Sequence, residues 1–363
     1  MKGGYPRVEI NLEHLRHNTR SVVELCKEHG ITVAGVIKGA TGDVEVAKAM
    51  ADEGVGAIAS SRLEQLEDAK NAGIDKPLAL VRVPMLSEVE DLIDIADMSL
   101  QSEMEVIKAV DKEAGKQGKL HKIILMADMG DLREGFWDKD EMIEACKEIE
   151  KMENVYLAGI GTNLGCYGSI SPTKEKLQEL VDLSKKVEEA LGRKLDFVSG
   201  GATSSLMRLY DGDMPEGINH LRIGEGILLA HDYVVLYGLM PETTGLYHDI
   251  FRLKAEVIEA KVKPSYPQGE IAFDAFGHKP EYEDRGMRKK VLLGMGKVDY
   301  AFIDELLPLD EGVELLGASS DHTIMDVTDA KREFKVGDIV EFEICYATMV
   351  YLTNCKNVKV VYV

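Results

Sequence analysis

The first two-thirds of the chain alternate between short apolar runs and longer amphipathic stretches, and this alternation limits the possible folds more than any other feature. The runs, rich in Val, Ile and Leu, occur at 31–38, 55–60, 77–83, 96–101, 122–128, 155–163, 195–201 and 220–229. The stretches between them, such as RLEQLEDAKNAG, carry apolar residues at helical spacing, and several end in Gly, which favours helix termination. Apolar strands bounded by helices indicate a parallel sheet covered by helices.

Eight strand–helix units over about 230 residues have the size of a (β/α)8 TIM-type barrel. An open doubly wound sheet is the alternative, but it should carry a GxGxxG turn after its first strand, where this chain has KGATGD. After about residue 235 the pattern changes to strands separated by turns, in FRLKAEVIEAKV, GEIAFDAFG, KKVLLGMGKV, VELLGASSDHTIMDV, DIVEFEICYATM and NVKVVYV. We therefore expect an α/β chain with a barrel at 8–235 and a mostly antiparallel β domain at 236–363 joined by residues 1–7. The strand-like VEIN at 8–11 could pair with that second domain.

Charge and cysteine usage exclude several classes of function. Lys and Arg total 43 against 64 Asp and Glu, a formal net charge of −21, which disfavours binding to nucleic acid or to a membrane surface. The acidity could attract cationic substrates or serve solubility alone. Five widely spaced cysteines without a CxxC motif argue against a disulfide framework or a zinc site and fit a cytoplasmic protein. No apolar run is long enough for a membrane span or a signal peptide.

Catalytic residues of such barrels gather at the carboxyl ends of the strands. The residues at these positions are Lys38, Arg82, Asp128, Arg133, Asn163, Cys166, 199–205 and 222–225. Lys38 is the most informative, because burial at a barrel mouth would lower its pKa and leave an amine able to form a Schiff base with a carbonyl compound. A strand-end lysine that simply points into water is the alternative.

Two loops at the end of the barrel could bind a phosphate. SGGATSSL (199–206) places glycines and hydroxyls between a strand and a helix, where amides and hydroxyls bind phosphate, although an ordinary Ser or Thr helix cap has the same composition. RIGEG (222–226) adds flexible backbone at the next strand end. A lysine on the first strand opposite such loops is the arrangement that pyridoxal phosphate requires.

At this point the chain resembles the alanine-racemase-like, fold type III pyridoxal-phosphate enzymes, and within them the ornithine racemase branch. The matching stretches run in the family's order along nearly the whole chain: VPMLSEVEDL, MADMGDLREG, GIGTNLGCYG, SGGATSSL, MPEGINHLRIGEGILL, EIAFDAFGHKPEYEDRG, LLGASSDHTIMDV and FKVGDIVEF. The resemblance implies a barrel with a C-terminal β domain and a homodimer whose active sites lie at the subunit interface.

The resemblance also assigns roles to individual residues. Lys38 matches the lysine that carries the cofactor, and Arg222 matches the arginine that faces the pyridine nitrogen and keeps it unprotonated. The phosphate would be held by Ser204 with Thr203 beside it, by the backbone of Gly224 and Glu225, and by Tyr346. Arg133 matches an arginine near the ring oxygen and the substrate carboxylate.

The chain departs from the family pattern at three single positions and in one short stretch. Asn163, Met126 and Gly42 stand where alanine racemases have a histidine against the ring, a carbamylated lysine and a tyrosine near the phosphate. The second catalytic base of the family is a tyrosine in a Ser-Tyr-Gly stretch, but the comparable stretch here is Ala-Phe-Gly at 275–277. Another group must therefore act, and the candidates, with the first preferred, are Tyr282, His278, Asp274 and His322.

These residues predict a racemase of a basic amino acid, most specifically ornithine, that uses two bases on opposite faces of the α-carbon. A carboxylate would select the cationic side chain: Asp321, with Ser320 beside it, is preferred over the acidic loop containing Glu281, Glu283 and Asp284, which could be a solvated loop. The alternatives are an alanine or broad-specificity racemase, a D-amino-acid aldolase or dehydratase, and a non-catalytic carrier of the cofactor. An aldolase would need a metal, for which the sequence shows no tidy ligand set, and a carrier would not need the second domain.

Overall fold

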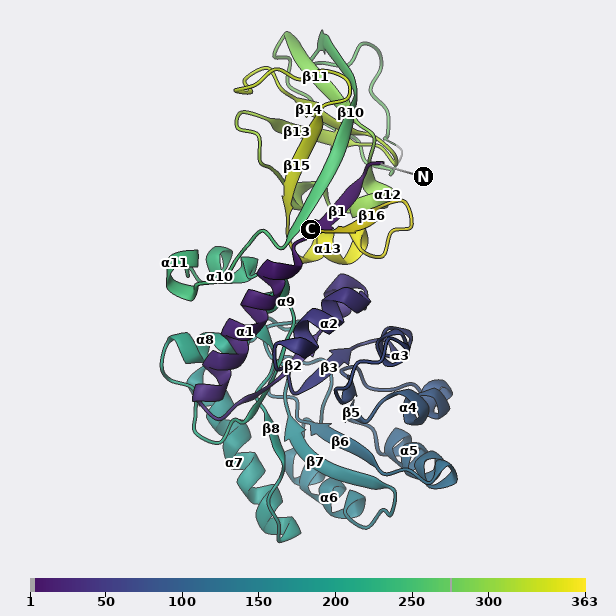
Figure 1. The fold of residues 1–363 in the computed structure, drawn as a ribbon, viewed down its shortest axis with the longest axis vertical. Coiled ribbons are helices and arrows are strands. Elements are labelled where there is room, and N and C mark those ends of the chain that lie inside the picture. Colours follow the sequence, from purple (N-terminus) through teal and green to yellow (C-terminus); the bar gives the residue numbers. More distant parts are fainter. Residues whose placement is uncertain (1–3, 275) are drawn as a thin grey trace. The chain divides into compact units, whose positions relative to one another are not determined.

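The computed structural model describes residues 4–274 and 276–363, which fall into two compact units (Figure 1). One unit comprises residues 15–246, and the other comprises residues 4–14 together with Tyr247–Val363. These limits differ from the expected boundaries after residues 7 and 235, because β1 (Arg7–Ile10) pairs within the sheet of the second unit. Residues 1–3 lie outside the described part of the chain. No helix in the described part is long and apolar enough to cross a membrane.

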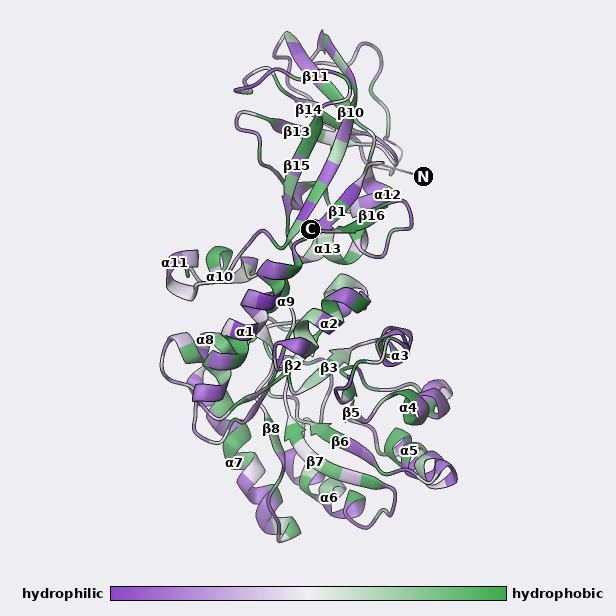
Figure 2. Ribbon diagram, viewed as in Figure 1, coloured by the Kyte–Doolittle hydropathy of each residue, from purple (hydrophilic) through white to green (hydrophobic). Residues whose placement is uncertain are grey.

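Residues 15–246 form a (β/α)8 barrel, as predicted. Its eight parallel strands close the barrel in chain order: β2 (Thr32–Val36), β3 (Ala57–Ser60), β4 (Leu78–Leu80), β5 (Met98–Gln101), β6 (His121–Met126), β7 (Val155–Gly161), β8 (Phe197–Ser199) and β9 (His220–Ile223). The helices that precede or connect these strands are α1 (Leu12–Glu28), α2 (Val44–Asp52), α3 (Leu63–Asn71), α4 (Val89–Ile95), α5 (Met104–Gln117), α6 (Lys139–Ile149), α7 (Lys174–Leu191) and α8 (Thr203–Tyr210). In Figure 2 these helices carry both hydrophobic and hydrophilic bands, as amphipathic helices around a barrel do.

Local signals set the ends of these helices. The Asp43 carboxylate accepts the Val46 amide at 3.0 Å at the start of α2, which satisfies one of the amides left without an intrahelical partner. Gly118 and Gly192 end α5 and α7 in the left-handed conformation, with φ of 63° and 70°. The prediction that glycines terminate helices is confirmed at these two helices.

The last apolar run is shorter as a strand than expected. The expected strand at 220–229 stops at Ile223, and the residues that follow form α9 (Glu225–Leu228), then α10 (His231–Val235) and α11 (Pro241–Thr244). The backbone leaves the extended conformation at Gly224, with φ −120° and ψ −78°. A Cβ at this position would lie 3.1 Å from the Val36 carbonyl oxygen, so glycine lets the chain turn close to β2.

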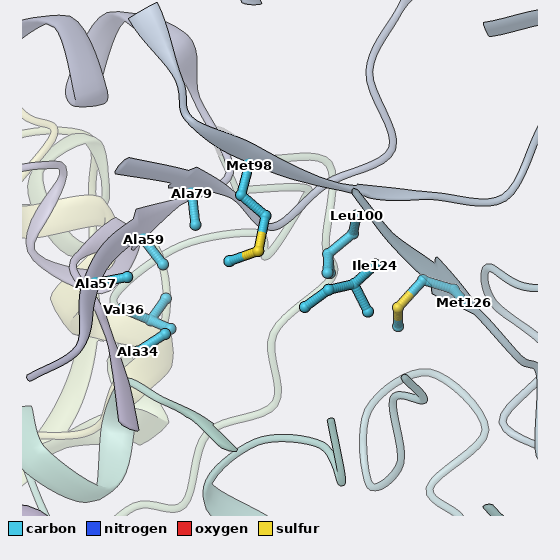
Figure 3. Packing of buried hydrophobic residues seen from close by; sticks show 9 residues of the cluster. All are labelled: Ala34, Val36, Ala57, Ala59, Ala79, Met98, Leu100, Ile124 and Met126. Carbon is cyan, nitrogen blue, oxygen red and sulfur yellow. The ribbon is translucent and has the colours of Figure 1, made fainter. Parts of the chain in front are cut away.

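The interior of the barrel is filled unevenly around its circumference. Small side chains of β2, β3 and β4 face the larger Met, Leu and Ile side chains of β5 and β6, as Figure 3 shows for Ala34, Val36, Ala57, Ala59, Ala79, Met98, Leu100, Ile124 and Met126. On β9 the interior is polar, because Arg222 lies opposite the interior residue Ala34 across β2 and β9. His220, two residues earlier, shares that face. Ser199 is on the interior face of β8, two residues after Phe197, which packs against the interior cluster.

The second unit is built on one mixed, mainly antiparallel sheet. Its strand order is β12 (Leu306–Pro308), β15 (Ile339–Ile344), β10 (Phe251–Pro264), β11 (Met287–Leu293), β14 (Thr323–Asp326) and β13 (Glu314–Ala318). β1 pairs antiparallel with β10 and parallel with β16 (Lys359–Tyr362). Buried and half-buried residues alternate along the first half of β10, which appears as alternating colours in Figure 2 and gives the sheet one buried face.

Two expected strands of this unit are wrong. Residues 269–277 were expected as a strand, but their described residues are irregular, because the Asp274 carboxylate accepts the Phe276 and His278 amides at 2.9 and 2.8 Å and folds the chain into a turn. The end of DIVEFEICYATM is helical: α13 (Tyr346–Leu352) follows β15, and the Thr348 hydroxyl accepts the Cys345 amide at 3.1 Å where the helix starts. The unit also contains the short helix α12 (Lys297–Tyr300).

Candidate active site at the barrel mouth

Lys38 lies just beyond β2, as the first residue of the 3-10 turn Lys38–Ala40. The turn is fixed to the barrel by the Ile37 amide, which donates to the Ala59 carbonyl at 2.9 Å. The residue is exposed, yet desolvation by the surrounding protein lowers the pKa of its amine, and repulsion from Arg133 lowers this pKa further. The amine of Lys38 is therefore accessible from solvent, and its charged form is disfavoured.

Arg222 reaches the same end of the barrel from the interior of β9. Its Nη2 donates to the Thr162 carbonyl at 2.8 Å, and its Nη1 donates to the Ser199 hydroxyl. Among the described residues no ion pair joins Arg222 to a carboxylate, although the residue is only 5% exposed. Burial lowers the pKa of Arg222 to about 10, so the guanidinium stays charged at neutral pH. Two hydrogen bonds use only part of its five N–H donors, and the rest are available to a ligand.

The loops that follow β7, β8 and β9 are tied together by hydrogen bonds. Ser204, in the first turn of α8, donates its hydroxyl to the Leu164 carbonyl at 3.0 Å. The hydroxyl of Thr203 accepts the Gly226 amide at 3.1 Å. These bonds hold the start of α8 next to the start of α9, and backbone amides at helix starts are suited to an anion.

Gly224 and Glu225 connect these loops to Lys38. Gly224 follows Ile223, which pairs with Gly35 of β2, and α9 lies against the turn that begins at Lys38. Glu225 opens α9 and is buried. The structure therefore brings together the amine of Lys38 and the backbone of the two glycine-containing loops that the sequence singled out.

Arg133, in the loop after β6, is held by Cys166, by Asn163 and by Glu134, and the sequence analysis did not single out Glu134. Its guanidinium forms a bidentate ion pair with Glu134, and its Nη1 donates to Cys166 Sγ at 2.9 Å. Hydrogen bonding to Glu134 raises the pKa of Arg133. With the Asn163 amide oxygen turned toward Arg133, that oxygen accepts from Nη1 and Nη2 at 3.2 and 3.1 Å. The adjacency of Arg133 and Glu134 in DLREG was the available signal for the ion pair.

The remaining predicted site residues lie in the second unit. Tyr282 lines a hollow of about 640 Å³, is 47% exposed, and stands edge-on to Tyr266 at 6.4 Å between ring centroids. Asp274 lines the same hollow, as do Glu281 and Glu283. Ala275, the first residue of the stretch that replaces Ser-Tyr-Gly, lies outside the described residues.

Ser320 and Asp321 occupy the turn between β13 and β14, where the Ser320 hydroxyl donates to the Asp321 carboxylate at 2.5 Å. His322 follows in the same turn, and its amide donates to the Ser319 hydroxyl at 3.1 Å. Tyr346 is the first residue of α13 and is half-buried. The roles of these residues stay predictions.

Comparison with known proteins places this geometry in a family. Residues 10–232 match the family model "Alanine racemase, N-terminal domain". The chain is 41% identical over 345 residues to an ornithine racemase of Acetoanaerobium sticklandii, covering 95% of this chain and 96% of that protein. It is also 41% identical over 363 residues to a lysine racemase of Thermotoga maritima, covering 99% and 98%.

The chain belongs to the alanine racemase family. Its fold agrees: an alanine racemase of Clostridium difficile 630 superposes with a TM-score of 0.77 at 21% identity, over 100% of this chain and 97% of that one. The protein is accordingly an amino-acid racemase, an isomerase. The family depends on pyridoxal phosphate.

The residues at the barrel mouth fit this cofactor. An aldehyde needs an amine that is partly uncharged, and desolvation by the surrounding protein lowers the pKa of Lys38 in that direction. An anionic phosphate needs hydroxyls and amides, which the starts of α8 and α9 supply. An aromatic nitrogen needs a donor, and Arg222 is a buried cation without a carboxylate partner among the described residues.

Proposed function

We propose that this protein is a pyridoxal-phosphate-dependent racemase of basic amino acids that interconverts L- and D-ornithine. The observation that carries the proposal is the presence, at one end of the barrel, of Lys38, an accessible amine with a lowered pKa, and of Arg222, a buried guanidinium hydrogen-bonded to two neutral oxygens. The choice of a basic substrate is supported by the two relatives, an ornithine racemase and a lysine racemase, each 41% identical to nearly the whole chain.

Eight residues of the barrel would hold the cofactor. Lys38 would bind its aldehyde carbon, and the phosphate would lie against the start of α8 and α9. Arg222 would face the ring nitrogen, with Asn163 beside the ring and Arg133 near the ring oxygen and the substrate carboxylate. The phosphate group would contact Thr203, Ser204, Gly224 and Glu225. When bound, pyridoxal phosphate supplies a conjugated electron-withdrawing ring that acidifies the α-proton of the attached amino acid.

The protein's own groups would then move the proton. The Nζ atom of Lys38 would take or return the α-proton on one face, which requires an amine that is neutral for part of the time. The charged guanidinium of Arg222 would keep the ring nitrogen unprotonated, so that charge at the α-carbon is short-lived and reprotonation there is favoured over other reactions. Two bases on opposite faces give inversion without rotation of the substrate.

The second base would come from the C-terminal unit of the partner subunit in a homodimer. Tyr282 is preferred because its phenol lines an open hollow and the residue is 47% exposed, whereas Asp274 is engaged by the backbone of its own turn. Tyr346 would approach the phosphate. Asp321, with Ser320 bonded to its carboxylate, would pair with the side-chain ammonium of the substrate.

Chiral chromatography of a panel of L-amino acids incubated with enzyme and cofactor tests the substrate class. Ornithine and lysine should racemise faster than alanine, and a preference for alanine would refute the proposed specificity. Asp321→Ala should reduce the preference for ornithine over alanine.

Borohydride reduction of the loaded protein, followed by peptide mapping, tests the role of Lys38. The label should fall on Lys38, and Lys38→Ala should abolish both label and racemisation. Lys139 is the matched control, because burial also lowers its pKa while its amine donates to the Phe136 carbonyl at 2.9 Å. Label on Lys139, or racemisation by the Lys38→Ala protein, would overturn the assignment.

Subunit complementation tests the shared site. Lys38→Ala and Tyr282→Phe proteins should each be inactive, and their mixed dimer would contain one intact site. Refolding an equal mixture should restore about a quarter of the wild-type activity, as expected for random exchange between two-fold-related subunits. If the mixture recovers no activity, Lys38 and Tyr282 act within one subunit or Tyr282 is not the base, and the shared site is refuted.

A further inference from the structure

Ser199, which accepts a hydrogen bond from Arg222, is itself hydrogen-bonded to His220. Ser199 Oγ accepts from Arg222 Nη1 and lies 2.8 Å from His220 Nδ1. Arg222 can only donate, and His220 Nδ1 is an acceptor within reach of the one Ser199 proton, so we assign that proton to the Ser199–His220 bond. His220 Nδ1 is therefore the acceptor, and the proton of the neutral ring is on Nε2.

Burial keeps His220 in this neutral form. Its side chain is 3% exposed, and burial together with repulsion from Arg222 lowers its pKa to about 3. Phe197 packs against the ring with centroids 4.9 Å apart. At neutral pH the ring can thus accept the Ser199 proton, and it adds no second charge beside the guanidinium.

The barrel strands set this geometry. Ser199 and His220 are directly paired across β8 and β9, and Arg222 lies two residues further along the same face of β9. The Thr162 carbonyl, which follows β7, accepts from the other terminal nitrogen of Arg222 at 2.8 Å. Two neutral oxygens from two neighbouring strand ends therefore fix the plane of the guanidinium without neutralising it.

We propose that Ser199 and His220 are positioning residues that fix the direction of Arg222 and keep it free of a counter-charge. This inference rests on the proposed function, in which Arg222 faces the ring nitrogen of the cofactor. Neither residue would touch the cofactor. His220 orients the hydroxyl of Ser199, and Ser199 in turn aims Arg222.

The first experiment reads the tautomer of His220 in the protein without cofactor. Nitrogen NMR of ¹⁵N-histidine-labelled protein, assigned by His220→Asn, should show Nε2 protonated and Nδ1 unprotonated at neutral pH. A proton on Nδ1 would overturn the proposal, because Ser199 could then not donate to it. This readout does not depend on whether the protein binds pyridoxal phosphate.

The second experiment compares two Ser–His pairs of the same chain. Ser99 Oγ and His121 Nε2 are 2.9 Å apart and both residues are buried. Within the described part of the chain no arginine side chain is hydrogen-bonded to either residue, so this pair serves as the structural control. Ser199→Ala and His220→Leu should weaken the binding of pyridoxal phosphate about tenfold or more, because a hydrogen bond to a charged group is lost or misdirected. Ser99→Ala and His121→Leu should leave this affinity within about twofold, since they perturb only packing and neutral hydrogen bonds.

A conservative variant separates positioning from packing. In His220→Asn the amide oxygen can take the place of Nδ1, so affinity should recover relative to His220→Leu. Ser199→Ala should also raise the ratio of transamination to racemisation, which a purely structural defect would leave unchanged. If Ser199→Ala and Ser99→Ala behave alike, the positioning role is refuted. If the wild-type protein does not bind pyridoxal phosphate at all, the proposed function fails instead.

Discussion

Substitution of Gly226 by alanine tests how tightly the start of α9 is packed. A Cβ at this position would lie 2.0 Å from Tyr233 Oη, 2.8 Å from Tyr233 Cζ and 3.0 Å from Thr203 Cγ2. Tyr233 is fully buried, and its ring packs against Tyr210 with centroids 6.0 Å apart, so it cannot swing into solvent. Overpacking of this kind lowers the free energy of unfolding by about 1–3 kcal/mol. Because the contact would be as short as 2.0 Å, we expect a loss at the upper end of this range, about 3 kcal/mol.

Urea unfolding and thermal melting measure the loss of stability. For a domain of this size about 2–4 °C of melting temperature corresponds to each kcal/mol, so the variant should melt about 6–12 °C lower. Affinity for pyridoxal phosphate should fall as well, because the Gly226 amide donates to Thr203 and helps to place α9 against α8. Gly317→Ala is the control, since a Cβ there meets nothing within 4 Å, and it should change stability by less than about 0.5 kcal/mol.

A second substitution, Tyr233→Phe, tests whether the contact with the tyrosine oxygen causes the loss of stability. Tyr233→Phe removes the oxygen that the new methyl group would strike, which raises the shortest contact from 2.0 to 2.8 Å. The double variant Gly226→Ala/Tyr233→Phe should therefore lose less stability than the sum of the single losses. Additive losses, or a Gly226→Ala protein as stable as Gly317→Ala, would refute the steric explanation.

Three further predictions concern stability and the barrel loops. Burial lowers the pKa of His121 to about 4 and that of His220 to about 3, so as pH falls below 6.5 the unfolded chain binds protons that the folded chain does not. The free energy of unfolding should then fall by about 1.4 kcal/mol per pH unit for each histidine, and His121→Leu should remove its share of the slope in urea unfolding. Asp131→Ala removes a buried carboxylate that accepts two backbone amides of the loop after β7, at 3.3 and 3.2 Å, and should destabilise by about 2 kcal/mol and lower kcat/KM. Gly159→Ala would place a Cβ 2.1 Å from the Phe197 carbonyl oxygen, a backbone atom, and circular dichroism should show that it prevents folding.

The alternation of apolar runs and helical patterns was sufficient to predict the barrel, because each parallel strand is buried on both faces and reads as a continuous apolar segment. The strand predicted at 220–229 was too long, because a short buried helix is as apolar as a buried strand and composition does not separate the two. The strand predicted at 269–277 was wrong for another reason. Its alternating apolar residues suggested a strand, but the Asp274 carboxylate turns the chain through local hydrogen bonds.

The candidate site was predictable where position along a strand decides it. Lys38 and Arg222 could be placed at the same end of the barrel from sequence alone, because all parallel strands end there. The Ser199–His220 contact could not, because it depends on the register of β8 against β9 and on which face of each strand points inward. The ion pair of Arg133 depends on the path of a loop.

The N-terminal strand has a consequence for how this protein is made. β1 precedes the barrel in the chain, whereas its partners, β10 and β16, are translated after the whole barrel. The barrel can fold as it emerges, whereas β1 must stay unpaired until β10 has been translated. A nascent chain released early would thus display an unprotected strand edge, which quality-control factors could recognise.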